Sequence, residues 1–485
     1  MMLQVAGFRG FAAAAALAAG NCTQEAGGGA RPPSPAATLP AAERPAAAPV
    51  PRPNLVLLTI DTLRADHLSC YGHFRKTSPF IDALAAESLL FERCYATIPH
   101  TTPSHASILT GVLPLEHGIT QNTWLATSEQ KRAAALVTTP QLQSYAQILK
   151  KHGWATGGFV SAATAARVTG LAAGFDAWSE PEADRRPGRE TLDDAKAWLA
   201  GTADRPFFLW IHLFDVHGPH KKDDPWEAYA ADFPEDDAQR EELARRGIKA
   251  AFEGRGGGQI RPIRFNVRYD ASIRFTDDLV AELVAALRAT GAWERTTFVL
   301  TSDHGEGLGE HDAIGHELTW GEQLRVPLIV RAPGRAGERL PQVMSGIDVL
   351  PTAVHLTPGL PHEELHAQAS GRSATADAFE ELPVFSIAPR EREFAVTLPR
   401  WKLVRRVEGG DALYDLADDP HELHDVKDEQ PRIAAALAAQ LEASLAEQER
   451  RRDWLRAGGV EPERSREAEQ RHREMLRALG YVEER

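Results

Sequence analysis

Asp61, Thr101 and the pair Asp303–His304 are the residues of this chain whose types could do chemistry together. Two carboxylates, one imidazole and one hydroxyl make an oxygen-and-nitrogen ligand set for a divalent metal ion. A Thr hydroxyl bound to such an ion is a workable nucleophile at neutral pH, whereas a free Thr hydroxyl is not. His217 and His316 could hold a second ion or bind the substrate directly.

The reaction that such a set would serve follows from charge. Phosphate and sulfate esters react through transition states that place negative charge on the equatorial oxygens, with the attacking and leaving oxygens in line. Metal ions neutralise these oxygens and activate the nucleophile. Single Asp and His residues are usually loop or core residues, so the prediction depends on the fold bringing these positions to one place.

The segment Thr101–Gly111 is predicted to begin a helix. Thr102 fits the N-cap position and Pro103 fits the first turn. Free backbone N–H groups at a helix start favour an alkoxide and a bound anion. Because Ser and Thr caps are common, this segment alone would indicate only a cap, and its chemical role depends on its neighbours in the fold.

Continuous apolar runs are the elements that would position these side chains. Each of three such runs is typical of a buried parallel strand and leads into a polar position: Asn54–Ile60 into Asp61, Pro206–Phe214 into the loop of His217, and Thr296–Thr301 into Asp303. Open α/β sheets bind their ligands at the carboxyl ends of the strands. We therefore expect an α/β fold with a polar site along one edge of a largely parallel sheet.

The remaining periodicity predicts helices around this sheet and a different C-terminal region. Helices are expected at 79–91, 145–152, 193–199 and 269–287, and further strands at 156–160 and 326–330. The polar, Gly-rich stretch from 220 to about 264 is interpreted as an insertion or lid, or as a loop. After about residue 361 we expect a small antiparallel sheet, with strands at 394–397, 402–404 and 413–416, followed by a helix at 431–449.

Composition excludes several classes of partner and scaffold. The chain has 485 residues, 25% of them charged, and a formal net charge of −14, which argues against a general nucleic-acid or anionic-membrane surface. Its only cysteines are Cys22, Cys70 and Cys94, so no disulfide scaffold or Cys-type zinc finger is expected. Pairing of Cys70 with Cys94 is left open by the sequence.

The N-terminus is typical of an export segment. Arg9 precedes the apolar run Phe11–Ala19, which is short for a transmembrane helix, and Cys22 follows. Leu17–Cys22 resembles a bacterial lipoprotein signal, although Asn21 departs from the small residue usual there. We expect a periplasmic protein or one tethered to the membrane of the cell envelope through Cys22, with an ordinary cleaved signal as the alternative.

These motifs together resemble the sulfatase family within the alkaline phosphatase superfamily. The similar stretches lie between Pro53 and about Pro431: Asn54–Asp66, Tyr269–Arg274, Thr301–His311, Leu324–Leu328, Leu413–Leu416 and Asp419-Pro420. The resemblance implies an alkaline-phosphatase-like fold and a divalent metal ion held by Asp61, Thr101, Asp303 and His304. It divides the chain into a signal peptide (1–22), a Pro/Ala/Gly-rich linker (23–52), a sulfatase-like catalytic domain (53–365), a C-terminal subdomain (366–460) and a helical tail (461–485).

The departures from the family concern the reaction. Sulfatases use Cys or Ser in Cys-x-Pro-Ser-Arg, which is converted to formylglycine; here Thr101 holds the Cys position and His105 the Arg position. Thr cannot become formylglycine, so that route is closed. Thr62 replaces the second Asp of the family's Asp-Asp pair, and Asp303–His304 replaces Asp-Asn. Fewer carboxylates and more imidazole favour Zn²⁺ or Mn²⁺ over Ca²⁺.

Relatives that handle phosphorus account for several of these departures. Thr nucleophiles are familiar in nucleotide pyrophosphatases and phosphodiesterases and in phosphoethanolamine transferases, and His217 and His316 resemble the His pair of the transferases. Asn122 falls where phosphonate monoester hydrolases have an Asn that contacts the oxyanion. We assign Asn122, His105 and His212 to substrate binding.

The sequence thus predicts a metal-dependent hydrolase of sulfate or phosphate esters that prefers phosphoesters. Thr101 would attack and water would cleave the covalent intermediate, while His217 and His316 orient groups or hold a second metal ion. The substrate would be a small-molecule, glycan or lipid ester. Two alternatives stay open: a transferase that passes a phospho-headgroup to a sugar or lipid, and a non-catalytic descendant that binds an anionic glycan.

Overall fold

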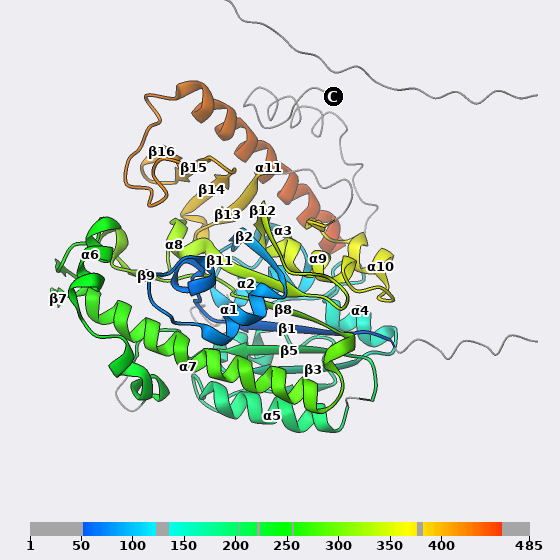
Figure 1. Cartoon of the computed structure of the whole chain (residues 1–485). Helices are drawn as coiled ribbons and strands as arrows, with labels where there is room; N and C mark the ends of the chain where they lie inside the picture. Colours follow the sequence, from blue (N-terminus) through cyan, green and yellow to red (C-terminus); the bar gives the residue numbers. More distant parts are fainter. Residues whose placement is uncertain are drawn as a thin grey trace, which may run out of the picture. The chain divides into compact units, whose positions relative to one another are not determined.

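A mixed eight-stranded sheet lies at the centre of the computed structural model (Figure 1). In spatial order its strands are β12 (Glu338–Ser345), β2 (Leu89–Tyr95), β11 (Arg325–Arg331), β8 (Thr296–Thr301), β1 (Asn54–Ile60), β5 (Phe207–Leu213), β3 (Ala155–Val160) and β4 (Ala177–Ser179). The run from β8 to β4 is parallel, whereas β11 is antiparallel to both of its neighbours. The mixed, largely parallel sheet that the sequence predicted is confirmed.

The structure describes residues 52–122, 135–202, 204–220, 224–254, 257–375 and 382–457. The predicted signal peptide with Cys22, the linker up to residue 51 and the helical tail 461–485 lie outside these ranges. Within them, no helix is long and apolar enough to cross a membrane. Cys70 and Cys94 are free thiols, so the disulfide that the sequence left open does not form.

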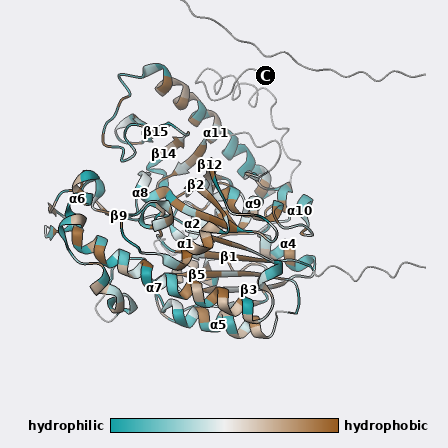
Figure 2. Ribbon diagram, viewed as in Figure 1, coloured by the Kyte–Doolittle hydropathy of each residue, from teal (hydrophilic) through white to brown (hydrophobic). Residues whose placement is uncertain are grey.

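Helices cover both faces of the sheet, because its central strands are apolar on both sides (Figure 2). One face packs against α1 (Pro79–Ala86), α5 (Gly188–Ala200) and α7 (Pro262–Ala289), and the other against α2 (Thr101–Thr110), α4 (Tyr145–Lys151) and α9 (Val349–His355). Alternate residues of β1 serve the two cores: Val56 and Leu58 face one, and Leu55 and Leu57 the other.

The C-terminal region forms the predicted antiparallel sheet and helix. Its strands run in the order β13 (Val384–Ile387), β14 (Glu393–Thr397), β15 (Trp401–Arg406) and β16 (Gly410–Asp415), and α11 (Pro431–Ala457) packs on them. A buried ion pair joins Lys402 of β15 to Glu422 at 2.8 Å, and the Lys402 ammonium also donates to the carbonyl of Thr319. The small sheet therefore supports the loop that carries His316.

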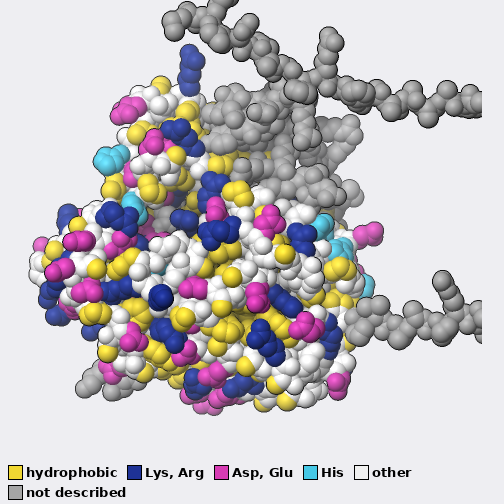
Figure 3. Space-filling model, in the orientation of Figure 1, with side chains coloured by type: hydrophobic (Ala, Val, Ile, Leu, Met, Phe, Trp, Pro, Cys, Tyr) yellow, Lys and Arg dark blue, Asp and Glu magenta, His cyan; other side chains and the backbone are white. Residues whose placement is uncertain are grey.

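Several shorter helices and hairpins lie around these two sheets. They are α3 (Pro114–His117), α6 (Asp237–Arg245), α8 (Gly321–Leu324), α10 (His362–Ala367), η6 (Pro225–Asp232) and the hairpins β6 (Phe252–Glu253) with β7 (Gln259–Ile260) and β9 (Gly307–Leu308) with β10 (Ile314–Gly315). The described part of the 220–264 insertion thus holds η6, α6 and the β6–β7 hairpin. On the face seen in Figure 3, acidic and basic side chains are interspersed.

One predicted helix is partly wrong. The helix expected at 79–91 ends at Ala86, and Leu89–Tyr95 forms strand β2 between β11 and β12. The short apolar run Leu89–Phe91 fits a helix face as well as a strand, and pairing with two neighbouring strands decides its conformation. The strands β12 and β13 were not predicted, because their own hydrophobic patterns are weak and pairing with neighbouring strands decides their conformation.

Candidate active site

Asp61, Asp303 and Thr101 meet at the carboxyl edge of the sheet. Thr59 of β1 pairs with Thr301 of β8, so the two parallel strands deliver the carboxylates to the same edge. Thr101 is the first residue of α2, and its hydroxyl donates a 3.3 Å hydrogen bond to Asp61 Oδ2. All three side chains are buried. The fold therefore brings together the hydroxyl and the two carboxylates that the sequence singled out.

Three ligand-type atoms at this edge have no hydrogen-bond partner: Asp61 Oδ1, Asp303 Oδ2 and His304 Nε2. They belong to one buried group whose ligand atoms lie within 4.8 Å of one another. His304 Nδ1 faces the Gly305 carbonyl at 2.9 Å, which places the ring proton on Nδ1 and leaves the Nε2 lone pair free. Buried polar atoms are rarely left unpartnered, so this set fits a divalent cation.

Burial and the charges of neighbouring side chains set the protonation of Asp61 and His304. Burial, together with the neighbouring Asp303 carboxylate, raises the pKa of Asp61 well above its ordinary value. Burial, followed by the nearby His316, lowers the pKa of His304 well below its ordinary value, so its imidazole is neutral. A neutral imidazole is the form that binds metal, and a cation would favour the ionised form of Asp61.

A second group lies beside the first. His217 Nε2 and His316 Nε2 are 3.1 Å apart, while each Nδ1 faces a backbone carbonyl, Gly218 for His217 and Pro99 for His316, the latter at 2.9 Å. Both Nε2 atoms of two neutral rings would then carry lone pairs, so a proton or a cation must lie between them. The His304 and His316 rings, 4.3 Å apart, join the two groups.

Glu306 belongs to this second group and was not predicted. Its carboxylate lies within 4.8 Å of the ligand nitrogens of His217 and His316, and burial raises its pKa. Although burial opposes it, the Glu306 carboxylate raises the pKa of His316. The only signal in the sequence is position, directly after Asp303-His304-Gly305. Two imidazoles and one carboxylate make a ligand set of the kind that Zn²⁺ prefers.

The start of α2 differs from the prediction. The N-cap is His100 rather than Thr102, and no side chain caps the helix. The Thr102 hydroxyl instead donates to the Thr164 carbonyl at 2.6 Å, which removes it from the capping role. The Thr102 N–H donates to Asn122 Oδ1 at 2.8 Å, so Asn122 is held against the helix start, next to Thr101.

His105 and His212 contact Thr101 and Asp61, and the substrate-binding role expected of them from the sequence stays a prediction. Both rings are fully buried. The nitrogens of His105 are engaged by the Thr101 carbonyl and the Thr59 hydroxyl, each at 2.9 Å. His212 Nε2 lies 3.1 Å from Asp61 Oδ2. The two rings thus contact Thr101 and Asp61, while His212 Nδ1 has no hydrogen-bond partner and both rings form a group of candidate ligands with Asp303.

Comparison with known proteins agrees with this geometry. The family model described as Sulfatase matches residues 53–360. The chain is 25% identical over 445 residues to an ulvan-active sulfatase from Formosa agariphila, covering 82% of this chain and 81% of that protein. It is 26% identical over 494 residues to the multifunctional alkaline phosphatase superfamily protein PehA from Trinickia caryophylli, covering 81% and 95%.

A solved structure shares the fold. The phosphonate monoester hydrolase of Agrobacterium radiobacter superposes with a TM-score of 0.61 at 20% identity, over 82% of this chain and 96% of that one. The family model spans more than half of the chain, from the strand before Asp61 to the loop after α9. The chain therefore belongs to the sulfatase family of the alkaline phosphatase superfamily, metal-dependent hydrolases that act on sulfate or phosphate esters.

Proposed function

We propose that this chain hydrolyses phosphoesters in preference to sulfate esters and uses Thr101 as its nucleophile. The observation that carries the proposal is the position of the Thr101 hydroxyl, hydrogen-bonded to Asp61 beside three unpartnered ligand atoms. Asp61, Asp303 and His304 would hold a divalent cation together with Thr101. The imidazole in this set favours Zn²⁺ or Mn²⁺ over Ca²⁺.

The cation, when bound, lowers the pKa of the hydroxyl it touches and neutralises the oxygens of the ester. The chain's own residues do the rest. The hydrogen bond to Asp61 Oδ2 aims the Thr101 side chain at the sheet edge. The Oδ1 atom of Asn122 accepts the Thr102 N–H, which leaves its NH₂ group to donate to an ester oxygen.

The reaction would proceed by two displacements at phosphorus. The Thr101 hydroxyl releases its proton to solvent and its oxygen forms a bond to phosphorus as the bond to the leaving oxygen breaks, and the leaving group departs with that electron pair. Water then attacks phosphorus and breaks the bond to Thr101, which restores the hydroxyl. His217 and His316 would orient the transferred group or, with Glu306, hold a second cation.

Preference for phosphorus rests on the chemistry of Thr. A Thr-sulfate lacks the elimination route by which formylglycine releases sulfate, so it would have to be hydrolysed directly. The substrate would be a small-molecule or glycan ester, and the N-terminal segment would send the protein to the cell envelope, with Cys22 as a tether.

One matched panel tests this function. Aryl phosphate, bis-aryl phosphate, aryl phosphonate and aryl sulfate are assayed on metal-analysed wild type, Thr101→Ala and Thr110→Ala. Thr110 lies at the other end of α2, and its hydroxyl donates within the helix, to the Ala106 carbonyl at 2.6 Å. We expect Thr101→Ala to lose phosphoester turnover by about 10³-fold or more, and Thr110→Ala to retain it.

Two outcomes would overturn the proposal. Turnover of any ester by Thr101→Ala at the wild-type rate would exclude Thr101 as the nucleophile for that ester. Turnover that requires an added sugar or lipid acceptor would identify a transferase instead of a hydrolase.

A further inference from the structure

The turn after Asp61 has an uncommon backbone conformation. Thr62 has a φ of 57°, in the left-handed region that β-branched residues rarely adopt. Such a conformation persists only where the surroundings hold it. Because Thr62 directly follows Asp61, whatever holds the turn also sets where the Asp61 carboxylate points.

The phenol of Tyr269 on α7 closes this turn. Its hydroxyl donates to the Thr62 carbonyl at 2.6 Å and accepts from the Arg64 N–H at 2.8 Å. One buried hydroxyl thus satisfies a backbone acceptor and a backbone donor on either side of Leu63. On the other side of the turn, the Thr62 N–H donates to Asp303 Oδ1 at 3.2 Å, so the turn also touches the second carboxylate of the site.

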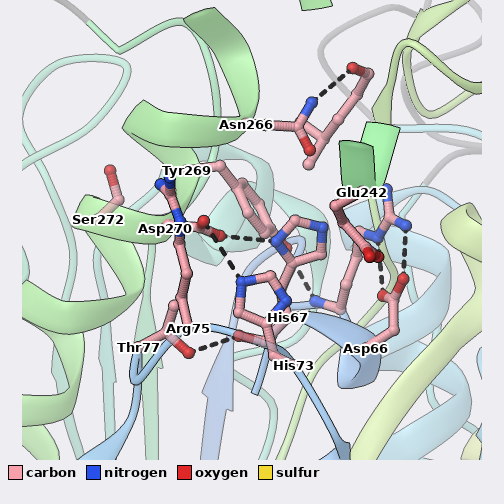
Figure 4. A network of polar contacts seen from close by, with 12 residues as sticks. Asp66, His67, His73, Arg75, Thr77, Glu242, Asn266, Tyr269, Asp270 and Ser272 are labelled. Atoms are coloured by element: carbon pink, nitrogen blue, oxygen red, sulfur yellow. Dashed lines mark hydrogen bonds and ion pairs between the residues drawn. The ribbon is translucent and has the colours of Figure 1, made fainter. Parts of the chain in front are cut away.

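The next residue of α7 holds the continuation of the same segment (Figure 4). Asp270 Oδ1 accepts from His67 Nδ1 at 2.8 Å, and Asp270 Oδ2 from His73 Nε2 at 3.3 Å. Two consecutive helix residues, Tyr269 and Asp270, therefore fix the segment 62–73 at four points. These two residues are held in place because α7 is a 28-residue helix packed on the sheet.

His67, His73 and Asp270 have the composition of a metal site, but the hydrogen bonds argue against one. Arg246 Nη1 donates to His67 Nε2 at 3.3 Å, which places the His67 proton on Nδ1, where it is donated to Asp270. A metal ion would have to displace this proton next to a guanidinium. The cluster is therefore a set of hydrogen bonds that fixes His67 and His73 to α7. We call this set, together with the contacts of Tyr269, the brace.

We infer that Tyr269 is a positioning residue for the metal ligand Asp61. The inference rests on the proposed function in one respect, that Asp61 holds the cation. Loss of the phenol oxygen would free the Thr62 turn, and the Asp61 carboxylate would no longer be held at the distance from Asp303 and His304 that the cation requires. The ring of a Phe at this position would keep the packing of α7.

The experiment compares Tyr269→Phe with Tyr71→Phe in the full chain. Tyr71 lies at the far end of the same segment, and its hydroxyl also bridges backbone groups, accepting from the Leu328 N–H at 2.9 Å and lying 3.0 Å from the Phe91 carbonyl and 3.2 Å from the Leu328 carbonyl, to which it can donate. Both variants lose a bridging hydroxyl, but only one touches the turn. Zn²⁺ is titrated against a chelating indicator, and the class of sites abolished by Asp61→Ala is followed.

We expect Tyr269→Phe to bind Zn²⁺ at the Asp61 site about 10–100-fold more weakly than wild type, and Tyr71→Phe to bind it as wild type does. Equal Zn²⁺ affinity in wild type and Tyr269→Phe, with thermal stability lowered alike in both Tyr variants, would reduce Tyr269 to a structural role. A wild type without an Asp61-dependent Zn²⁺ class would instead refute the proposed metal site. Should Tyr269→Phe not fold, Asp270→Asn is titrated in its place, and wild-type affinity there would refute the brace.

Discussion

Replacing Asp303 with Asn should have opposite effects on the metal-free and the metal-bound protein. Asp303 Oδ1 accepts from the N–H groups of Thr62 and His304, at 3.2 and 3.0 Å, and the Asn carbonyl can keep both bonds. Asp303 Oδ2 is buried without a partner, 3.4 Å from the free Nε2 of His304. An amide NH₂ in its place removes a buried charge and supplies a donor for that nitrogen.

The size of each effect can be worked from these contacts. An unsatisfied buried group costs about 1–3 kcal/mol, so metal-free Asp303→Asn should exceed wild type by about 2 kcal/mol in free energy of unfolding. Zn²⁺ at a thousand times its Kd stabilises wild type by about 4 kcal/mol, and the variant should lose most of this gain. With Zn²⁺ present, wild type should then be the more stable by about 2 kcal/mol.

The assay is denaturant unfolding in EDTA and in excess Zn²⁺, with Asp348→Asn as the matched control. Asp348 is also buried, but its oxygens accept from the N–H groups of Arg372 and Ser345, so its amide would be destabilising to the same extent in both conditions. Two results would refute the assignment of Asp303 Oδ2 as a metal ligand. One is an Asp303→Asn protein that is less stable than wild type in EDTA, and the other is a variant whose free energy of unfolding rises with Zn²⁺ as much as that of wild type.

Three further predictions concern the rest of the structure. Burial and Asp303 raise the pKa of Asp61, so at any pH below that pKa Zn²⁺ displaces a proton from the carboxyl. Calorimetry should therefore show affinity for Zn²⁺ rising as the pH rises through that raised pKa, and pH-independent affinity would contradict this. Glu306→Gln should remove a second bound ion in metal analysis and keep the first, and retention of both would exclude Glu306 as a ligand. Lys402→Met should lower the free energy of unfolding by about 3–5 kcal/mol, because it leaves the buried Glu422 carboxylate without its ion-pair partner. Adding Glu422→Gln should recover most of that loss, and no recovery would contradict the pairing.

The sheet was predictable from the sequence where burial alone decides the structure. The strand at Asn54–Ile60 has the predicted bounds because a continuous apolar run between polar ends has few other solutions in an α/β fold. Leu89–Tyr95 was missed because its conformation depends on pairing with strands that come more than 200 residues later in the chain. Local pattern carries no information about such partners.

The candidate site was predictable to the extent that strand ends converge. Asp61 and Asp303 could be placed at one edge because each ends a parallel strand. The contacts of His105 and the place of Glu306 in the second group could not be predicted, since sequence spacing does not show whether a ring faces the core or whether a carboxylate reaches a neighbouring loop. The contact of Tyr269 with Thr62 was equally invisible, because it joins two segments only through space.

The stereochemical outcome at phosphorus tests the central claim most directly. A phosphorothioate diester that is chiral at phosphorus is hydrolysed in isotopically labelled water, and the configuration of the product is determined. Attack by Thr101 followed by attack of water inverts the centre twice, so the prediction is net retention, with no product formed by Thr101→Ala. Net inversion would show that water attacks the ester directly and that Thr101 forms no covalent intermediate.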